Sequence, residues 1–230
     1  MATAEILREL NPRIDDVRAF LTDELTGAGD VALTCSFQAE GVLLTRLAIE
    51  IDPYIPVLFI DTGYHFSETY EYRDRLVREW GINLINLLPE KTVAEQEKQH
   101  GLLYNSSPDL CCRMRKVEPL FKAMADYRVW ISGLRRDQSR SRADLEQRSM
   151  FTLPSGKQIL KLAPLTDWTT RDVYYACEQL EIPLHPLYER GFTSIGCEPC
   201  TTLPIDPNDP RSGRWGGRKE ECGIHIQPAK

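Results

Sequence analysis

Short apolar runs alternate along this chain with stretches in which apolar residues recur every three or four positions. The apolar runs predict β-strands at 31–37, 56–61, 82–88, 128–134 and 158–165. The helix-periodic stretches predict helices at 5–26, 40–51, 67–80, 92–100, 113–126 and 169–180. Strands alternating with helices are typical of βαβ units. We therefore expect a doubly wound α/β fold with a mostly parallel sheet.

The alternating pattern ends near residue 190. The remaining segment is rich in Pro, Gly and charged residues and has no periodic apolar face. It predicts an extended, mobile tail. We thus divide the chain into an α/β domain at 1–190 and a C-terminal segment at 191–230.

Composition narrows the class of protein. The 230 residues are 42% hydrophobic and 27% charged, which suits one large globular domain. The sequence has no run of about 18 apolar residues, which a membrane-spanning helix would need. Its acidic N-terminus does not resemble a signal peptide. We expect a cytoplasmic protein, in which stable disulfides are rare. A homo-oligomer is compatible with this composition.

The net charge of −6 argues against a general nucleic-acid surface. Arginines nevertheless gather in "LRRDQSRSR" and "RSGRWGGRK", which is typical either of a small-anion site or of a solvated face. Polar stretches also follow three predicted strands: "SFQAEG", "DTG" and "SGLRRDQSR". Ligands bind beyond the carboxyl ends of such strands. The turn at Ser36 leads into a helix N-terminus, which favours phosphate; a plain strand-to-helix turn remains the alternative.

Four of the seven cysteines form two close pairs, Cys111 with Cys112 and Cys197 with Cys200. A redox dithiol fits poorly, because Cys-x-x-Cys here lies late in the chain. Structural zinc favours ligands two to four residues apart, and adjacent cysteines suit a single ion poorly. In an iron–sulfur cluster each thiolate can bind a separate iron. The spacing favours a cluster and leaves zinc as the alternative.

Cys222 lies in the polar tail, where burial does not explain a thiol. Lys219 precedes it and His225 follows it, and both can favour a thiolate. Cys222 is therefore a candidate nucleophile. Cys35 and Cys177 occupy core-like positions and indicate packing.

These residues together resemble the assimilatory adenosine 5′-phosphosulfate (APS) reductases of the phosphoadenylylsulfate reductase family. The likeness runs over about 30–227 and depends on the two cysteine pairs and the terminal "ECGIHIQ". It implies a 4Fe–4S cluster on Cys111, Cys112, Cys197 and Cys200. It also implies that Cys222 attacks the sulfur of APS, and that thioredoxin then releases sulfite from the Cys–S-sulfonate.

The same resemblance implies further site residues. Lys116 would lie between cluster and substrate, and His225 would assist Cys222. The residues implied to bind APS are Ser36, Phe37, Gln38, Glu40, Thr62, Gly133, Arg142, Arg211 and Arg214. The family pattern leads us to expect an acidic residue after "SFQAE", and Gly41 departs from it.

Two other functions remain open at this point. A 3′-phospho-APS reductase shares the fold and tail but characteristically lacks the four cluster cysteines. A zinc-containing relative of the ATP pyrophosphatases would carry a glycine-rich "SGGxDS"-type loop, which "SFQAEG" is not.

Overall fold

The computed structural model describes residues 2–27, 29–219 and 221–225, and within them the chain forms one six-stranded sheet. The strands are β1 (Val31–Thr34), β2 (Val57–Ile60), β3 (Leu84–Leu87), β4 (Val129–Ser132), β5 (Arg148–Thr152) and β6 (Gln158–Leu162). Their order is β3-β2-β1-β4-β6-β5, and all neighbours pair in parallel except β5 with β6. The prediction of a doubly wound, mostly parallel sheet is confirmed.

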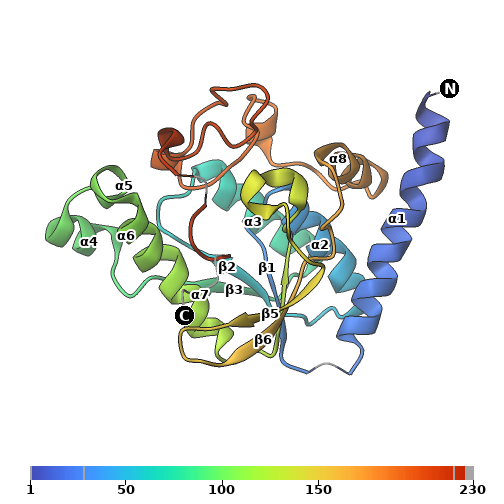
Figure 1. Cartoon of the computed structure of the whole chain (residues 1–230), viewed down its shortest axis with the longest axis horizontal. Helices are drawn as coiled ribbons and strands as arrows, with labels where there is room; N and C mark the ends of the chain where they lie inside the picture. Colours follow the sequence, from blue (N-terminus) through green and yellow to red (C-terminus); the bar gives the residue numbers. More distant parts are fainter. Residues whose placement is uncertain (1, 28, 220, 226–230) are drawn as a thin grey trace.

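Helices cover both faces of this sheet (Figure 1). The helices are α1 (Ala2–Leu25), α2 (Ala39–Ile51), α3 (Ser67–Trp80), α4 (Val93–His100), α5 (Leu103–Ser106), α6 (Pro108–Cys112), α7 (Glu118–Met124) and α8 (Thr170–Gln179). Helices α1, α2, α3 and α8 bury the larger core, around Leu33, Leu47 and Phe59. Helix α7 covers the other face, where Trp130 and Phe151 pack.

The observed elements differ from the predicted ones in the helical segment before β4 and at the edge of the sheet. The predicted helix at 113–126 begins earlier, at Pro108, and passes through a π-helical turn at Arg113–Val117 before α7. Strand β5 was not predicted. It forms a hairpin with β6 through a turn closed by Gly156 N–H donating to the Leu153 carbonyl at 2.8 Å, with Gly156 at φ +85°. The signal for this hairpin is "LPSG" between two alternating segments.

The tail packs against the domain instead of extending away from it. Short bridges join His65 to Cys197 and Thr201 to Arg214, and Trp215 is only 2% exposed. In Figure 1 the red end of the chain returns toward the strands. The expected extended conformation is therefore wrong for the described residues up to 225. Residues 226–230 of that segment lie outside the described residues, and its movement stays a prediction.

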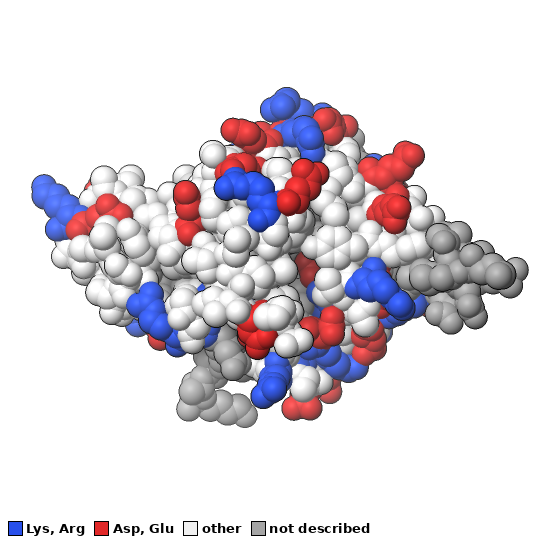
Figure 2. All heavy atoms as spheres, turned by 90° about the horizontal axis from the view of Figure 1, so that it is seen from above, with Lys and Arg blue, Asp and Glu red and all other residues white. Residues whose placement is uncertain are grey.

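Surface charge is mixed. Figure 2 shows acidic and basic side chains interspersed over the visible face. Among the described residues, no helix is long and apolar enough to cross a membrane.

Gly133 allows β4 to end close against the start of α2. A Cβ at Gly133 would lie 2.9 Å from Glu40 Cβ, closer than real Cβ atoms approach, and 3.2 Å from the Glu40 carbonyl carbon, which is also a tight contact. We expect Gly133→Ala to lower the free energy of unfolding by about 1–3 kcal/mol, because the backbone must shift to fit the methyl group.

Denaturant unfolding of Gly133→Ala beside Gly29→Ala measures this effect. An added Cβ at Gly29 meets no atom within 4 Å, so Gly29→Ala is a matched control. Equal stability of the two variants would contradict the close-approach argument.

Candidate functional site

A cavity of about 170 Å³ opens at the carboxyl ends of β1, β2 and β4, with the tail along its side. Because parallel strands end at one edge of the sheet, loops distant in sequence converge there. Ten of the predicted site residues line the cavity: Ser36, Gln38, Glu40, Lys116, Gly133, Arg142, Arg211, Arg214, Cys222 and His225. Phe37 and Thr62 do not line it.

Phe37 supports the loop after β1 from the core side. Its backbone has φ +57°, a strained value for an aromatic residue. Its ring is 1% exposed and makes edge contacts with Phe59 and Tyr72 at centroid distances of 5.6 and 6.4 Å. Core packing therefore holds the turn that leads into α2. The role that remains for Phe37 in binding is through its backbone.

Gln38 ties this loop to the tail segment, because Ile195 N–H donates to Gln38 Oε1 at 2.8 Å. The presence of glycine at position 41 has a steric explanation. A Cβ there would lie 3.0 Å from Cys35 Sγ, so the acidic residue expected at this position would collide with the buried thiol.

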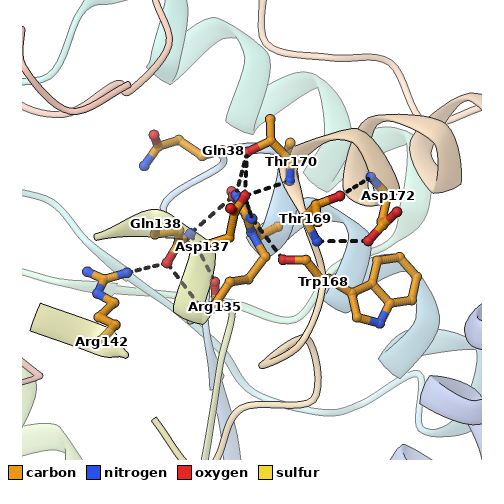
Figure 3. Close-up of polar contacts among 12 residues, drawn as sticks. Gln38, Arg135, Asp137, Gln138, Arg142, Trp168, Thr169, Thr170 and Asp172 are labelled. Atoms are coloured by element: carbon orange, nitrogen blue, oxygen red, sulfur yellow. Dashed lines mark hydrogen bonds and ion pairs between the residues drawn. The ribbon is translucent and has the colours of Figure 1, made fainter. Parts of the chain in front are cut away.

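The Glu40 carboxylate is held by a buried arginine. Arg135 Nη2 donates to Glu40 Oε1 at 2.7 Å, and Gln138 Nε2 donates to the same oxygen at 3.0 Å. Arg135 also bonds the Trp168 carbonyl and Thr170, as the network in Figure 3 shows. Glu40 thus fixes the loop after β4 against α2. Sequence reasoning did not single out Arg135, although it lies in the "SGLRRDQSR" motif.

Thr62 lies behind the cavity wall, toward the cysteines. Its Oγ1 and Cys197 Sγ share a hydrogen bond at 3.2 Å. The Thr62 carbonyl accepts from Arg115 Nε, and Arg115 Nη1 also donates to Gln96 Oε1 at 3.1 Å. Thr62 is thereby placed to link the loop after β2 to the cysteine segments.

Four of the predicted site residues that line the cavity are cations, and one of them, Arg142, comes from the loop after β4. Lys116 comes from the π-helical turn, and Arg211 and Arg214 from the tail. Arg214 is buried, with Nη1 donating to Ser194 Oγ and the Ile195 carbonyl, both at 3.2 Å. Its Nε has no hydrogen-bond partner among the described residues. Gly196 makes room for it, since a Cβ there would lie 1.9 Å from Arg214 Nη2.

Lys116 also lines a second, smaller cavity, which contains all four paired cysteines. Burial acts to lower the pKa of Lys116, but the nearby sulfurs of Cys197, Cys112 and Cys222 outweigh it and raise the pKa. Lys116 thus lies between the cysteine cavity and the cavity at the strand ends, and its predicted place between cluster and substrate stays a prediction.

The possible metal ligands in the wall of the second cavity are all cysteine thiols. Cys111, Cys112, Cys197 and Cys200 line it, all as free thiols, and no imidazole or carboxylate shares its wall. In the described part of the chain, no three Cys, His, Asp or Glu side chains are arranged to hold a single metal ion. Four thiols around one cavity fit an iron–sulfur cluster, in which each binds a separate iron.

Cys222 is half-buried and lines the anion cavity. Lys219 Nζ donates to Asp109 Oδ1 at 2.6 Å, and its expected aid to Cys222 stays a prediction. The ammonium groups that interact electrostatically with Cys222 are those of Lys116 and Lys161.

His225 stacks on Trp130, with ring centroids 5.4 Å apart and planes 22° from parallel. Burial, reinforced by the cations Lys161, Arg142 and Arg211, holds its pKa well below the ordinary value. The imidazole is therefore uncharged. Its buried Nδ1 has no hydrogen-bond partner among the described residues, and its role beside Cys222 stays a prediction.

Lys161 was missed from the sequence. It is 5% exposed, and its Nζ lies 4.6 Å from the Trp130 ring centroid and 5.1 Å from that of Phe151. Burial, helped by the Arg142 charge, lowers its pKa to about 7. A lysine inside the apolar run "QILKLAPL" was the available signal.

Comparison with known proteins agrees with this geometry. The model of the phosphoadenosine phosphosulfate reductase domain matches residues 30–203. The chain belongs to this family. An adenosine 5′-phosphosulfate reductase of Rhodococcus opacus (strain B4) is 38% identical over 221 residues, which cover 95% of this chain and 88% of that protein. One of Bacillus cereus (strain B4264) is 41% identical over 202 residues, covering 86% and 85%.

Among solved structures, the family member phosphoadenylyl-sulfate reductase of Candida auris, in a phosphate complex, superposes with a TM-score of 0.70. It is 25% identical, and the match covers 81% of this chain and 90% of that one. An FMN adenylyltransferase of Candida glabrata superposes with a TM-score of 0.63 at 16% identity, covering 95% and 75%. The second likeness extends the fold beyond the family.

We predict that Lys161 titrates near pH 7 in the folded protein. Its ordinary pKa is about 10.4, and burial in an aromatic enclosure disfavours the charged form. The folded pKa is depressed, so the ammonium is neutralised as pH rises through about 7.

NMR titration of protein labelled with 13C at lysine Cε detects this change, and the Lys161→Met variant assigns the signal. One lysine resonance should shift between about pH 6 and 8 and be missing from the variant. If no lysine signal moves below about pH 9, the described environment of Lys161 is wrong.

Proposed function

We propose that this protein reduces adenosine 5′-phosphosulfate to sulfite and AMP, as an assimilatory reductase that uses thioredoxin. The observation that carries the proposal is Cys222, a thiol in the wall of a cavity that also presents Lys116, Arg211 and Arg214. A nucleophile facing a cation-lined cavity suits an anionic electrophile. The relatives named adenosine 5′-phosphosulfate reductase support the choice of substrate.

The loop after β1 and the start of α2 would receive the phosphate. α2 has 13 residues, and its N-terminal N–H groups and dipole favour an anion at this end. Ser36 and Gln38 present polar side chains to the same cavity. Arg211, Arg214 and Lys116 would bind the phosphosulfate by charge-assisted hydrogen bonds.

The reaction then proceeds in two steps, transfer of the sulfonate group to Cys222 and release of sulfite. The Cys222 thiolate attacks the sulfate sulfur of APS, the bond from that sulfur to the bridging phosphate oxygen breaks, and AMP leaves with the electron pair. The Cys222 thiol must lose its proton as it attacks, and we propose His225, which lines the same cavity, as the group that assists this step. A thioredoxin thiolate next attacks Cys222 Sγ and expels sulfite. The second thioredoxin thiol resolves the mixed disulfide, so thioredoxin is oxidised and sulfur is reduced.

Cys111, Cys112, Cys197 and Cys200 would hold a 4Fe–4S cluster. When bound, the cluster would supply a fixed charged group beside the substrate and join two segments distant in sequence. Lys116, which lines both cavities, would couple its charge to that of the substrate.

The cluster assignment predicts that Cys112→Ser loses iron and sulfide, because the four thiols act as one ligand set. Chemical iron and sulfide analysis and visible absorption of protein purified without oxygen measure the loss. Cys177→Ala is the matched control: Cys177 is a fully buried thiol in α8, outside the cysteine cavity. Full iron content in Cys112→Ser would contradict the four-ligand assignment.

The mechanism requires a sulfonate on Cys222. Wild-type protein incubated with APS and no thioredoxin should gain one sulfonate on the peptide that contains Cys222, as measured by mass spectrometry. Cys222→Ser should form neither adduct nor sulfite and should still bind APS. An adduct on Cys35 or Cys177 would show that the nucleophile is another thiol. Faster adduct formation from the 3′-phosphorylated substrate would favour the related 3′-phospho-APS reductase activity instead.

A further inference from the structure

Glu221, next to Cys222 in the chain, makes the best-formed ion pair of the tail. Arg142 Nε donates to Glu221 Oε1 at 2.8 Å, and Arg142 Nη2 donates to Oε2 at 2.8 Å. Both side chains are 10% exposed. A bidentate pair fixes orientation as well as distance, and burial shields it from water.

Further donors surround the same carboxylate. The hydroxyls of Ser139 and Ser141 donate to Glu221 Oε1 at 3.2 and 3.3 Å, and Arg211 Nη2 lies 4.0 Å from Oε2. Burial acts to raise the pKa of Glu221, but the hydrogen bonds and charge of Arg142 outweigh it and lower the pKa. The carboxylate is therefore ionised and held by the loop after β4.

A second anchor follows Cys222. Ile224 packs against the apolar cluster beneath α7, and His225 stacks on Trp130. Gly223 lies between the Glu221 ion pair and the packed residues Ile224 and His225. Its φ of +92° is a conformation that favours glycine. Cys222 thus lies between an ion pair on one side and a buried ring on the other.

We infer that Glu221 is a positioning residue, whose pair with Arg142 holds the Cys222 sulfur in the wall of the anion cavity. The inference rests on the proposed function, in which Cys222 is the nucleophile. The carboxylate is on the adjacent residue, so losing its bonds lets the Cys222 backbone move. Small displacements of a nucleophile reduce rates strongly because the reacting atoms must be close and aligned.

A competing interpretation makes different predictions. If Glu221 only occupies Arg142 until the substrate arrives, it competes with the anion of APS. Removing its charge would then tighten APS binding and leave the rate of attack unchanged. A positioning residue instead changes the rate and has little effect on affinity.

Glu221→Gln keeps the size of the side chain and removes its charge. In a single turnover with saturating APS and no thioredoxin, we expect adduct formation on Cys222 to slow by about tenfold or more, because truncating one partner of a buried charge pair is costly. APS affinity, measured for Glu221→Gln in the Cys222→Ser background, should change by less than about threefold. Release of sulfite from preformed adduct by thioredoxin should not slow. Glu50→Gln, which removes an equivalent charge from a partly exposed pair with Arg46, is the matched control.

The double variant Glu221→Gln with Arg142→Gln tests the partnership. If the two side chains act as one unit, the double variant forms adduct no more slowly than the slower single variant. Additive losses, an unchanged rate in Glu221→Gln, or tighter APS binding without a slower rate would each overturn the inference. Absence of adduct in the wild type would instead refute the proposed function itself.

Discussion

Repulsion among cations gathered at one partly closed cavity is the constraint on which this site depends. Lys116, Arg142, Arg211 and Arg214 line the same space. Like charges repel strongly where water is excluded. Glu221 compensates part of this charge through its ion pair with Arg142. The remaining positive potential points into the cavity, where an anionic ligand would be attracted.

The sheet topology explains why residues so distant in sequence meet there. Strand β1 lies between β2 and β4, so the loops that follow these strands share one edge. Periodicity predicts the mostly parallel sheet, because apolar strands alternating with helices admit few other folds, but it does not predict the strand order. It also places Ser36 and Gly133 at one edge of the sheet, since both lie at the carboxyl end of a predicted strand. Strand β5 escaped this reasoning because "RSMFT" lacks the long apolar run of a central strand.

Side-chain partnerships were less predictable from sequence than side-chain positions. The motif containing Cys222 and His225 was recognisable, and so were the two cysteine pairs. The pairing of Lys219 with Asp109 was not, because it joins residues 110 positions apart. Phe37 shows the same limit: its place in the motif predicts a binding loop, whereas only packing against Phe59 and Tyr72 shows that its ring is structural. Partnerships of this kind depend on tertiary geometry, which no local pattern encodes.

The π-helical turn at Arg113–Val117 has a consequence for evolution of the site. A π turn adds a residue to the helical repeat and rotates the faces that follow it. Cys111 and Cys112 precede the turn, whereas Lys116 lies within it and α7 continues beyond. Deleting one residue here would restore a regular helix and keep α7 on the sheet, but it would rotate the cysteines away from Lys116. The thiol cavity is therefore sensitive to a single-codon deletion that leaves the sheet in place.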